Sequence, residues 1–219
     1  MLIGHYGPAF VLARAEPRLP LPLLFVAVQA VDIGWDLLVP LGVERAHLQP
    51  GFLPSNDLVL ESMPYTHSLL AAVLWGAAAA VLWMLFRGRQ SDAMWRPALL
   101  LGTAVLSHWI LDLPMHAGDL PLAGDASAHV GFGLWANRSM SVGLEAAIYG
   151  GSWRLWAGKS PTRAAWWLLA AGEFVNAATY FGPAPTQIVG VCMATLAVYV
   201  AMALAARRAA THVRSAIVG

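Results

Sequence analysis

The sequence contains 219 residues, of which 58% are hydrophobic and only 11% are charged, and its mean hydropathy is +0.61. A soluble domain carries about 25% charged residues, so this composition excludes an ordinary water-exposed protein and predicts an integral membrane domain over residues 1–219. The formal net charge of +1 gives no reason to expect a nucleic acid partner.

Six segments are apolar enough to be considered as membrane spans, each of which takes about 20 helical residues. In chain order they cover residues 21–43, 68–86, 97–113, 141–157, 164–181 and 185–206. A shorter helix over residues 5–14 is expected to dip into the membrane ahead of them. The predicted fold is therefore all-α, a polytopic transmembrane bundle of about six spanning helices.

Basic residues are concentrated in alternate connections between these segments, which predicts that those connections are cytoplasmic. The basic residues concerned are Arg14, Arg18, Arg87, Arg89, Arg96, Lys159, Arg163, Arg207, Arg208 and Arg214. The longer connections, residues 44–67 and 116–138, are richer in acidic residues, histidine, glycine and proline and are expected outside. This distribution predicts a protein of the bacterial inner membrane with both termini on the cytoplasmic side.

Several ionisable side chains fall inside the predicted spans, about 14 to 24 Å from the nearest basic residue of the same segment at 1.5 Å per helical residue. They are His5, Asp32, His108, Asp112, Glu145 and Glu173. Such residues are costly in a bilayer, and they normally face the bundle interior and mark function. Asn176 lies one turn beyond Glu173, and for both residues, as for Glu145, simple pairing between helices is an equally good interpretation.

The segment SHWILDLPMH, residues 107–116, carries the most specific pattern. His108, Asp112 and His116 recur every four residues and share one helix face. Mixed histidine and carboxylate sets bind divalent metals such as zinc, and three or four ligands suffice. Asp32, His67 and His5 come from other segments at a similar depth, so we predict a metal site between helices. His116 fits a second-metal ligand and a solvated histidine equally well.

With these residues in place, the chain resembles the membrane-bound family of predicted metal-dependent hydrolases, which is grouped with zinc-dependent phospholipase C and related zinc nucleases. The resemblance covers about the first two-thirds of the chain and lies in four segments, GHYGPAF, VQAVDIGWD, PYTHSLL and SHWILDLPMH. On this basis the metal-site part is expected at about residues 1–150, with accessory helices at about 160–210.

The resemblance implies specific ligands. Asp32, His67, His108 and Asp112 would surround one zinc ion, and His5 would join Asp112 at a second. A third metal is not expected, because Ser141 stands four residues before Glu145 where those relatives have histidine. The expected cofactor is one or two divalent transition metal ions, with zinc as the first choice.

The function implied is a membrane-embedded hydrolase that acts on a phosphoester or lipid-like substrate from the extracytoplasmic side. Asp32 or Asp36, whichever does not bind metal, would be the general base, and Glu145 would orient the ligands. The alternative is a divalent-cation or proton transporter that uses the same histidines and acids. A structural membrane protein with a polar core is a third interpretation. The sequence does not indicate an oligomeric state.

Overall fold

The computed structural model describes the backbone of residues 1–87 and 95–218 and the side chains of residues 1–86 and 95–211. Arg89 therefore lies outside the described residues, as do the side chains of Arg87 and Arg214. Eight α-helices and two small antiparallel sheets make up the described part. The helices are α1 Tyr6–Ala15, α2 Leu21–Val28, α3 Ala30–Leu38, α4 Leu69–Arg87, α5 Trp95–Asp112, α6 Arg138–Ala157, α7 Arg163–Phe181 and α8 Ile188–Val218.

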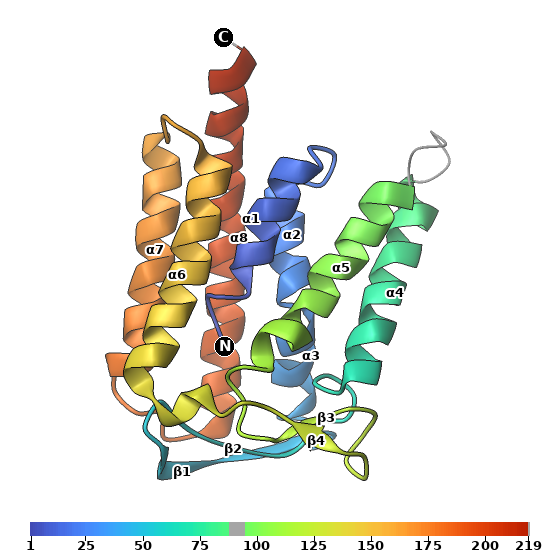
Figure 1. The fold of residues 1–219 in the computed structure, drawn as a ribbon, viewed down its shortest axis with the longest axis vertical. Coiled ribbons are helices and arrows are strands. Elements are labelled where there is room, and N and C mark those ends of the chain that lie inside the picture. The colour runs from blue at the N-terminus through green and yellow to red at the C-terminus, as the bar shows by residue number, and fades with distance from the viewer. Residues whose placement is uncertain (88–94, 219) are drawn as a thin grey trace.

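The helices stand side by side and their connections gather at two ends (Figure 1). The α1–α2 and α6–α7 connections lie at one end together with the end of α8. The opposite end is covered by the strands β1 Arg45–Leu53, β2 Asn56–Ser62, β3 Leu120–Pro121 and β4 His129–Val130. The connections that carry Arg18 and Lys159 thus share one end of the bundle, and we call it the basic end.

The prediction of six membrane spans is wrong. Within the described residues, two helices are long and apolar enough to cross a membrane, over Leu69–Phe86 in α4 and Ile188–Thr211 in α8. The pair α2 and α3 would make a third if it is one bent span. Helices α5, α6 and α7 have 18 to 20 residues, but they do not meet that test. Charged and polar side chains such as Arg96, Glu145 and Glu173 lower their average hydropathy.

The first predicted span, residues 21–43, is also not a single straight helix. It is broken at Gln29 into α2 and α3, whose axes differ by 49°. A helix end leaves carbonyl groups without helical partners, and here the Val28 carbonyl at the end of α2 accepts a hydrogen bond from His108 Nδ1 at 2.8 Å. The break therefore provides an anchor for a candidate ligand on another helix.

The strands correct the expectation of an all-α fold. In the hairpin of β1 and β2, Ala46 pairs with Leu60 and Leu48 pairs with Leu58. In the first half of β1, Ala46 and Leu48 alternate with polar residues, as in a sheet with one buried face. Leu58 and Leu60 of β2 pack on a core that includes Trp35 and Met63. The sequence did not predict these strands because Gly, Pro and acidic residues around them are typical of a polar connection between apolar helices.

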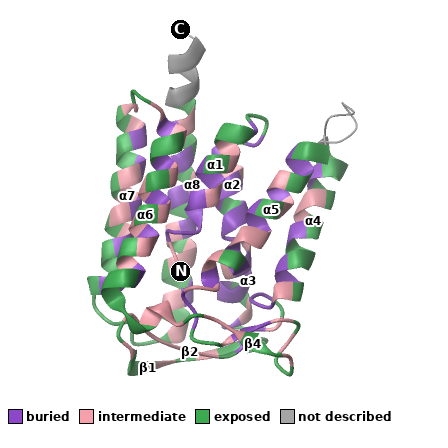
Figure 2. Cartoon of the chain, in the orientation of Figure 1, coloured by how far each residue is buried: buried purple, intermediate pink, exposed green. Residues whose placement is uncertain are grey.

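An aromatic core holds α1 in place. Tyr6 stacks on Phe25, and the rings of Phe10 and Phe25 meet edge to face with centroids 5.3 Å apart. Tyr149 of α6 contacts both α1 aromatics. Figure 2 shows buried residues on the inward faces of the helices and exposed residues on the outward faces. His5 directly precedes α1, so this packing fixes its position.

Candidate metal centre

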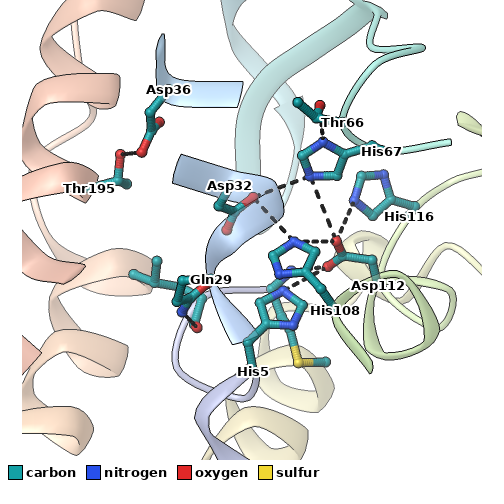
Figure 3. A network of polar contacts seen from close by, with 12 residues as sticks. His5, Gln29, Asp32, Asp36, Thr66, His67, His108, Asp112, His116 and Thr195 are labelled. Carbon is teal, nitrogen blue, oxygen red and sulfur yellow. Dashed lines mark hydrogen bonds and ion pairs between the residues drawn. The ribbon is translucent and has the colours of Figure 1, made fainter. Parts of the chain in front are cut away.

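All six predicted ligands lie in one cluster (Figure 3). They come from five parts of the chain: the residue before α1, α3, the turn before α4, the last turns of α5 and the connection after it. The members are His5, Asp32, His67, His108, Asp112 and His116. Five of these six residues are buried, and Asp32 is half-buried.

Asp112 is the centre of the cluster. Its Oδ2 lies 3.2 Å from His108 Nε2 and 3.9 Å from the Nε2 atoms of His67 and His116. Its Oδ1 lies 3.1 Å from His5 Nε2. Four imidazoles therefore direct the same nitrogen toward one carboxylate.

Asp32 approaches from the opposite side. Its Oδ1 lies 3.2 Å from His67 Nε2 and 3.3 Å from His108 Nε2. Two sets of three ligand atoms result, in each of which the atoms lie within 4.8 Å of one another. One set is His67, His108 and Asp112, and the other is His5, Asp32 and His108. The rings of His5 and His108 stack with centroids 3.7 Å apart.

The Nδ1 atoms of three histidines are held by hydrogen-bond acceptors. Thr66 Oγ1 gives its proton to Glu44 Oε2 at 2.6 Å, so it accepts from His67 Nδ1 at 2.8 Å. His108 Nδ1 donates to the Val28 carbonyl, which can only accept. With Nδ1 protonated, the neutral ring leaves the Nε2 lone pair directed at the carboxylates, as in metal-binding histidines.

His116 has the same arrangement. Its Nδ1 lies 2.9 Å from Asp119 Oδ1. Burial by itself would raise the pKa of the Asp119 carboxyl, but the hydrogen bond from His116 lowers that pKa below its usual value. An ionised Asp119 accepts the Nδ1 proton, and Nε2 again faces Asp112. His116 is only 2% exposed, which disfavours the interpretation of a solvated histidine.

The donor set fits a divalent metal. Neutral imidazole nitrogens and carboxylate oxygens both offer lone pairs, so their convergence within 4.8 Å is stabilised by a cation or by added protons between them. The Met1 ammonium supplies one positive charge beside Asp112 Oδ1. The buried Nε2 atoms of His5 and His108 have no hydrogen-bond partner in the described structure. Two carboxylates would offset the charge of a dication and lower the cost of burying it.

Met1 also contacts this cluster. Its amino nitrogen lies 2.5 Å from Asp112 Oδ1 in a buried contact. From the cluster, α1 runs toward the basic end of the bundle (Figure 1). The location of both termini on the cytoplasmic side remains a prediction.

Two residues outside the ligand set were predicted to assist catalysis, Asp36 as a general base and Glu145 by orienting the ligands. Asp36 points toward α8, where its Oδ2 accepts a hydrogen bond from Thr195 Oγ1 at 2.7 Å (Figure 3). Glu145 accepts the backbone N–H groups of Leu2 and Gly4 at 2.8 and 3.0 Å, and the hydroxyl of Tyr180 at 2.8 Å. Glu145 thus holds the segment that carries His5.

Sequence reasoning left open the roles of Glu173 and Asn176. Asn176 Nδ2 donates to the Val142 carbonyl of α6 at 3.3 Å, which is a contact between helices. A Cβ on Gly150 of α6 would lie 3.5 Å from Glu173 Oε1, so Glu173 also faces α6. These contacts agree with the interpretation of pairing between helices.

Four residues that support the ligands were missed. They are Glu44, Thr66, Asp119 and Tyr199. Thr66 stands next to His67 in PYTHS and Asp119 lies three residues after His116, so proximity to a ligand was an available signal for both. Glu44 and Tyr199 lie far from their partners in sequence, and no local pattern identifies them.

A cavity of about 300 Å³ reaches the cluster from the strand-covered end. This volume is at the lower end of the about 300 to 1,000 Å³ typical of ligand pockets. Asp32, His67, Asp112 and His116 line it on the metal side. Leucines of the β1–β2 hairpin and Arg138 of α6 also line it. The cluster is thus reachable by a ligand that has both polar and apolar parts.

None of the family models, curated proteins or solved structures compared with this chain matches it. The resemblance to metal-dependent hydrolases therefore rests on the motif residues, and the structure supports it to the extent of a buried histidine and aspartate cluster that could hold a metal ion.

Proposed function

We propose that this protein is a membrane-embedded, metal-dependent hydrolase that acts on a phosphoester or lipid-like substrate. One observation carries the proposal: the Nε2 atoms of His67, His108 and His116 all face Asp112 Oδ2 while each Nδ1 is held by an acceptor. This arrangement prepares neutral imidazoles for a metal before any metal binds.

The proposed ligand set follows from the two groups of converging atoms. His67, His108 and Asp112 would hold one ion, with His116 close enough to join them. His108 can serve only one ion, because its Nδ1 is held by the Val28 carbonyl and only Nε2 is free. His5 and Asp32 would therefore join that ion or hold a second one without His108. When bound, a divalent metal such as zinc supplies Lewis-acid activation of water at neutral pH. Asp36 is left out of this set because its carboxylate faces Thr195.

The cavity supports the proposed substrate class. Arg138 is a cation in its lining, and a guanidinium pairs well with a phosphate group. Leu48, Leu58 and Leu60 offer an apolar surface on the hairpin side. A substrate with an anionic head and an apolar tail would match both. The β1–β2 hairpin that lines the cavity lies at the end opposite the basic connections, which supports access from the extracytoplasmic side.

The first experiment is elemental analysis of the protein purified in detergent. We expect about one or two equivalents of transition metal in the wild type, as in sites with three or four protein ligands, and loss of metal in His108→Ala. His129→Ala is the matched control, because His129 is exposed on β4 and should keep the metal. Wild-type protein that stays free of metal after zinc addition, or metal retained in His108→Ala, would contradict the proposal.

Hydrolysis is then separated from transport. The metal-loaded protein should cleave a phosphoester or lipid-like substrate in detergent, where no gradient exists, and His108→Ala should not. Metal-dependent flux into proteoliposomes without cleavage of any substrate tested would instead favour the transporter.

A further inference from the structure

Helix α8, which carries none of the predicted motif, contacts both acids of the segment VDIGWD. Tyr199 Oη donates to Asp32 Oδ2 at 2.9 Å, and Thr195 Oγ1 donates to Asp36 Oδ2 at 2.7 Å. The two hydroxyl residues are four apart on α8, and the two acids are four apart on α3. Two similar hydrogen bonds therefore join the same two helices one turn apart.

The two bonds differ in whether the carboxylate that accepts them also faces the histidine cluster. Asp32 faces the cluster with its other oxygen, because Oδ1 lies 3.2 Å from His67 Nε2 and 3.3 Å from His108 Nε2. Asp36 points toward α8 and away from the cluster in Figure 3. Only the bond from Tyr199 thus acts on a candidate ligand.

We propose that Tyr199 is a positioning residue of the metal centre, which holds Asp32 so that Oδ1 alone is presented to the metal. This inference rests on the proposed metal site and does not depend on which reaction the protein catalyses. Tyr199 is 6% exposed, and it lines the cavity together with Asp32. Without that hydroxyl, Asp32 Oδ2 loses its donor and the carboxylate is free to turn. Loss of such an outer partner lowers metal affinity by about 10- to 100-fold.

The test compares Tyr199→Phe with Thr195→Val. Each removes one hydroxyl–carboxylate bond between α3 and α8 and keeps the shape of the side chain. Zinc affinity is measured by competition with a chromophoric chelator, and the visible spectrum of the Co²⁺-loaded protein reports the ligand geometry. We expect zinc affinity to fall about 10- to 100-fold in Tyr199→Phe, with an altered Co²⁺ spectrum, and both to be unchanged in Thr195→Val.

Three results would overturn the inference. Wild-type affinity and spectrum in Tyr199→Phe would show that the hydroxyl does not position Asp32. An equal loss of zinc affinity in both variants would show that the affinity depends on the packing of α3 against α8 and not on the bond from Tyr199. If the wild type binds no zinc, the proposed metal site fails, and this inference fails with it. If the wild type binds zinc and Tyr199→Phe has no effect, only this inference fails.

Folding is checked by thermal unfolding of the metal-free forms. If Tyr199→Phe does not fold, a fluorinated tyrosine incorporated at position 199 keeps the ring and alters the strength of the hydroxyl as a donor. A change in zinc affinity and Co²⁺ spectrum then supports the inference, and unchanged values overturn it.

Discussion

At the scale of single residues, whether His67 Nε2 can bind a metal depends on which ring nitrogen carries the proton. Thr66 Oγ1 must accept from His67 Nδ1, because its own proton goes to the buried carboxylate of Glu44. Glu44 Oε1 also accepts the backbone N–H groups of Tyr65 and Thr66, at 2.8 and 3.0 Å. Glu44 therefore fixes both the turn that carries His67 and the tautomer of its ring.

Thr66→Val should weaken metal binding while Thr66→Ser should not. Valine has the shape of threonine but gives His67 Nδ1 no acceptor, so we expect zinc affinity to fall about 10- to 100-fold. Loss of the hydroxyl also leaves buried groups unpaired, at a cost of about 1 to 3 kcal/mol in the free energy of unfolding. Chelator competition and thermal unfolding measure the two effects. Equal zinc affinity in the valine and serine variants would show that the tautomer is not set by Thr66.

The site residues could be predicted only in part from the sequence. The six predicted ligands lie close together. They could be selected from the sequence because ionisable residues are rare in and beside apolar segments. Their supporting contacts could not be predicted. Asp36 has the carboxylate that a general base needs, yet it faces Thr195. Glu145 accepts hydrogen bonds from the Leu2 backbone N–H and from the Tyr180 hydroxyl. Composition does not say which way a side chain points.

At the scale of elements, a glycine contact between α4 and α5 sets the distance between two ligand-bearing segments. Gly76 and Gly102 face each other so closely that a Cβ on Gly102 would lie 2.7 Å from the Gly76 carbonyl oxygen. His67 lies just before α4, and α5 carries His108 and Asp112. A side chain at this contact would move the two helices apart and separate the ligands.

We expect Gly102→Ala to destabilise the protein and Gly143→Ala to leave it as stable or more so. The alanine methyl at position 102 meets backbone, at a cost of about 1 to 3 kcal/mol for overpacking. Gly143 lies in α6, and a Cβ there would have no neighbour within 4 Å among the described residues, so alanine gains about 0.5 to 1 kcal/mol. Thermal unfolding in detergent compares the two variants. Equal effects of both substitutions would mean that the α4–α5 contact tolerates separation.

Helices were easier to predict than their connections and breaks. The predicted segment 164–181 contains most of α7, and the segment 68–86 contains most of α4, because long apolar runs between polar turns identify helices locally. Position 29 is neither glycine nor proline, so the local sequence does not predict the break between α2 and α3. It is associated with contacts to distant residues, since Gln29 Nε2 donates to the Leu2 carbonyl and Val28 accepts from His108.

At the scale of the whole molecule, the basic connections and the hairpins near the cavity lie at opposite ends of the bundle. The α6–α7 connection, with Lys159, is at the basic end, whereas the β3–β4 hairpin is at the end that the cavity reaches. In the part of the chain that the structure describes, two helices are long and apolar enough to cross a membrane, and the bent pair α2 and α3 could make a third span. Only 22% of the Leu69–Phe86 span is buried within the protein. The apolar surface that α4 leaves uncovered suits contact with lipid.

This arrangement predicts which end is accessible from outside the cell. A cysteine at Ala126, exposed in the β3–β4 turn, should react with a membrane-impermeant maleimide in intact cells. A cysteine at Lys159 should react only after the membrane is permeabilised. The wild type is the control, because its Cys192 is buried. The reverse labelling pattern would place the cavity on the cytoplasmic side and contradict the proposed access.

The division into a metal-site part at about residues 1–150 and accessory helices remains a prediction, and one contact argues against treating the second part as separate. Tyr199, on the last helix, donates to Asp32 in the first third of the chain. The last helix thus belongs physically to the candidate site, although its sequence carries no ligand.

The sequence by itself determined most of the helical segments, the choice of candidate ligands and the asymmetric distribution of basic residues, since each depends on local composition or spacing. Only the tertiary structure decided the number of candidate spans, the strands over the cavity and the partner of each ligand. The physical reason is distance along the chain. The contacts that orient His108 and Asp32 join residues 80 and 167 positions apart, and such pairs form only when the whole bundle is packed.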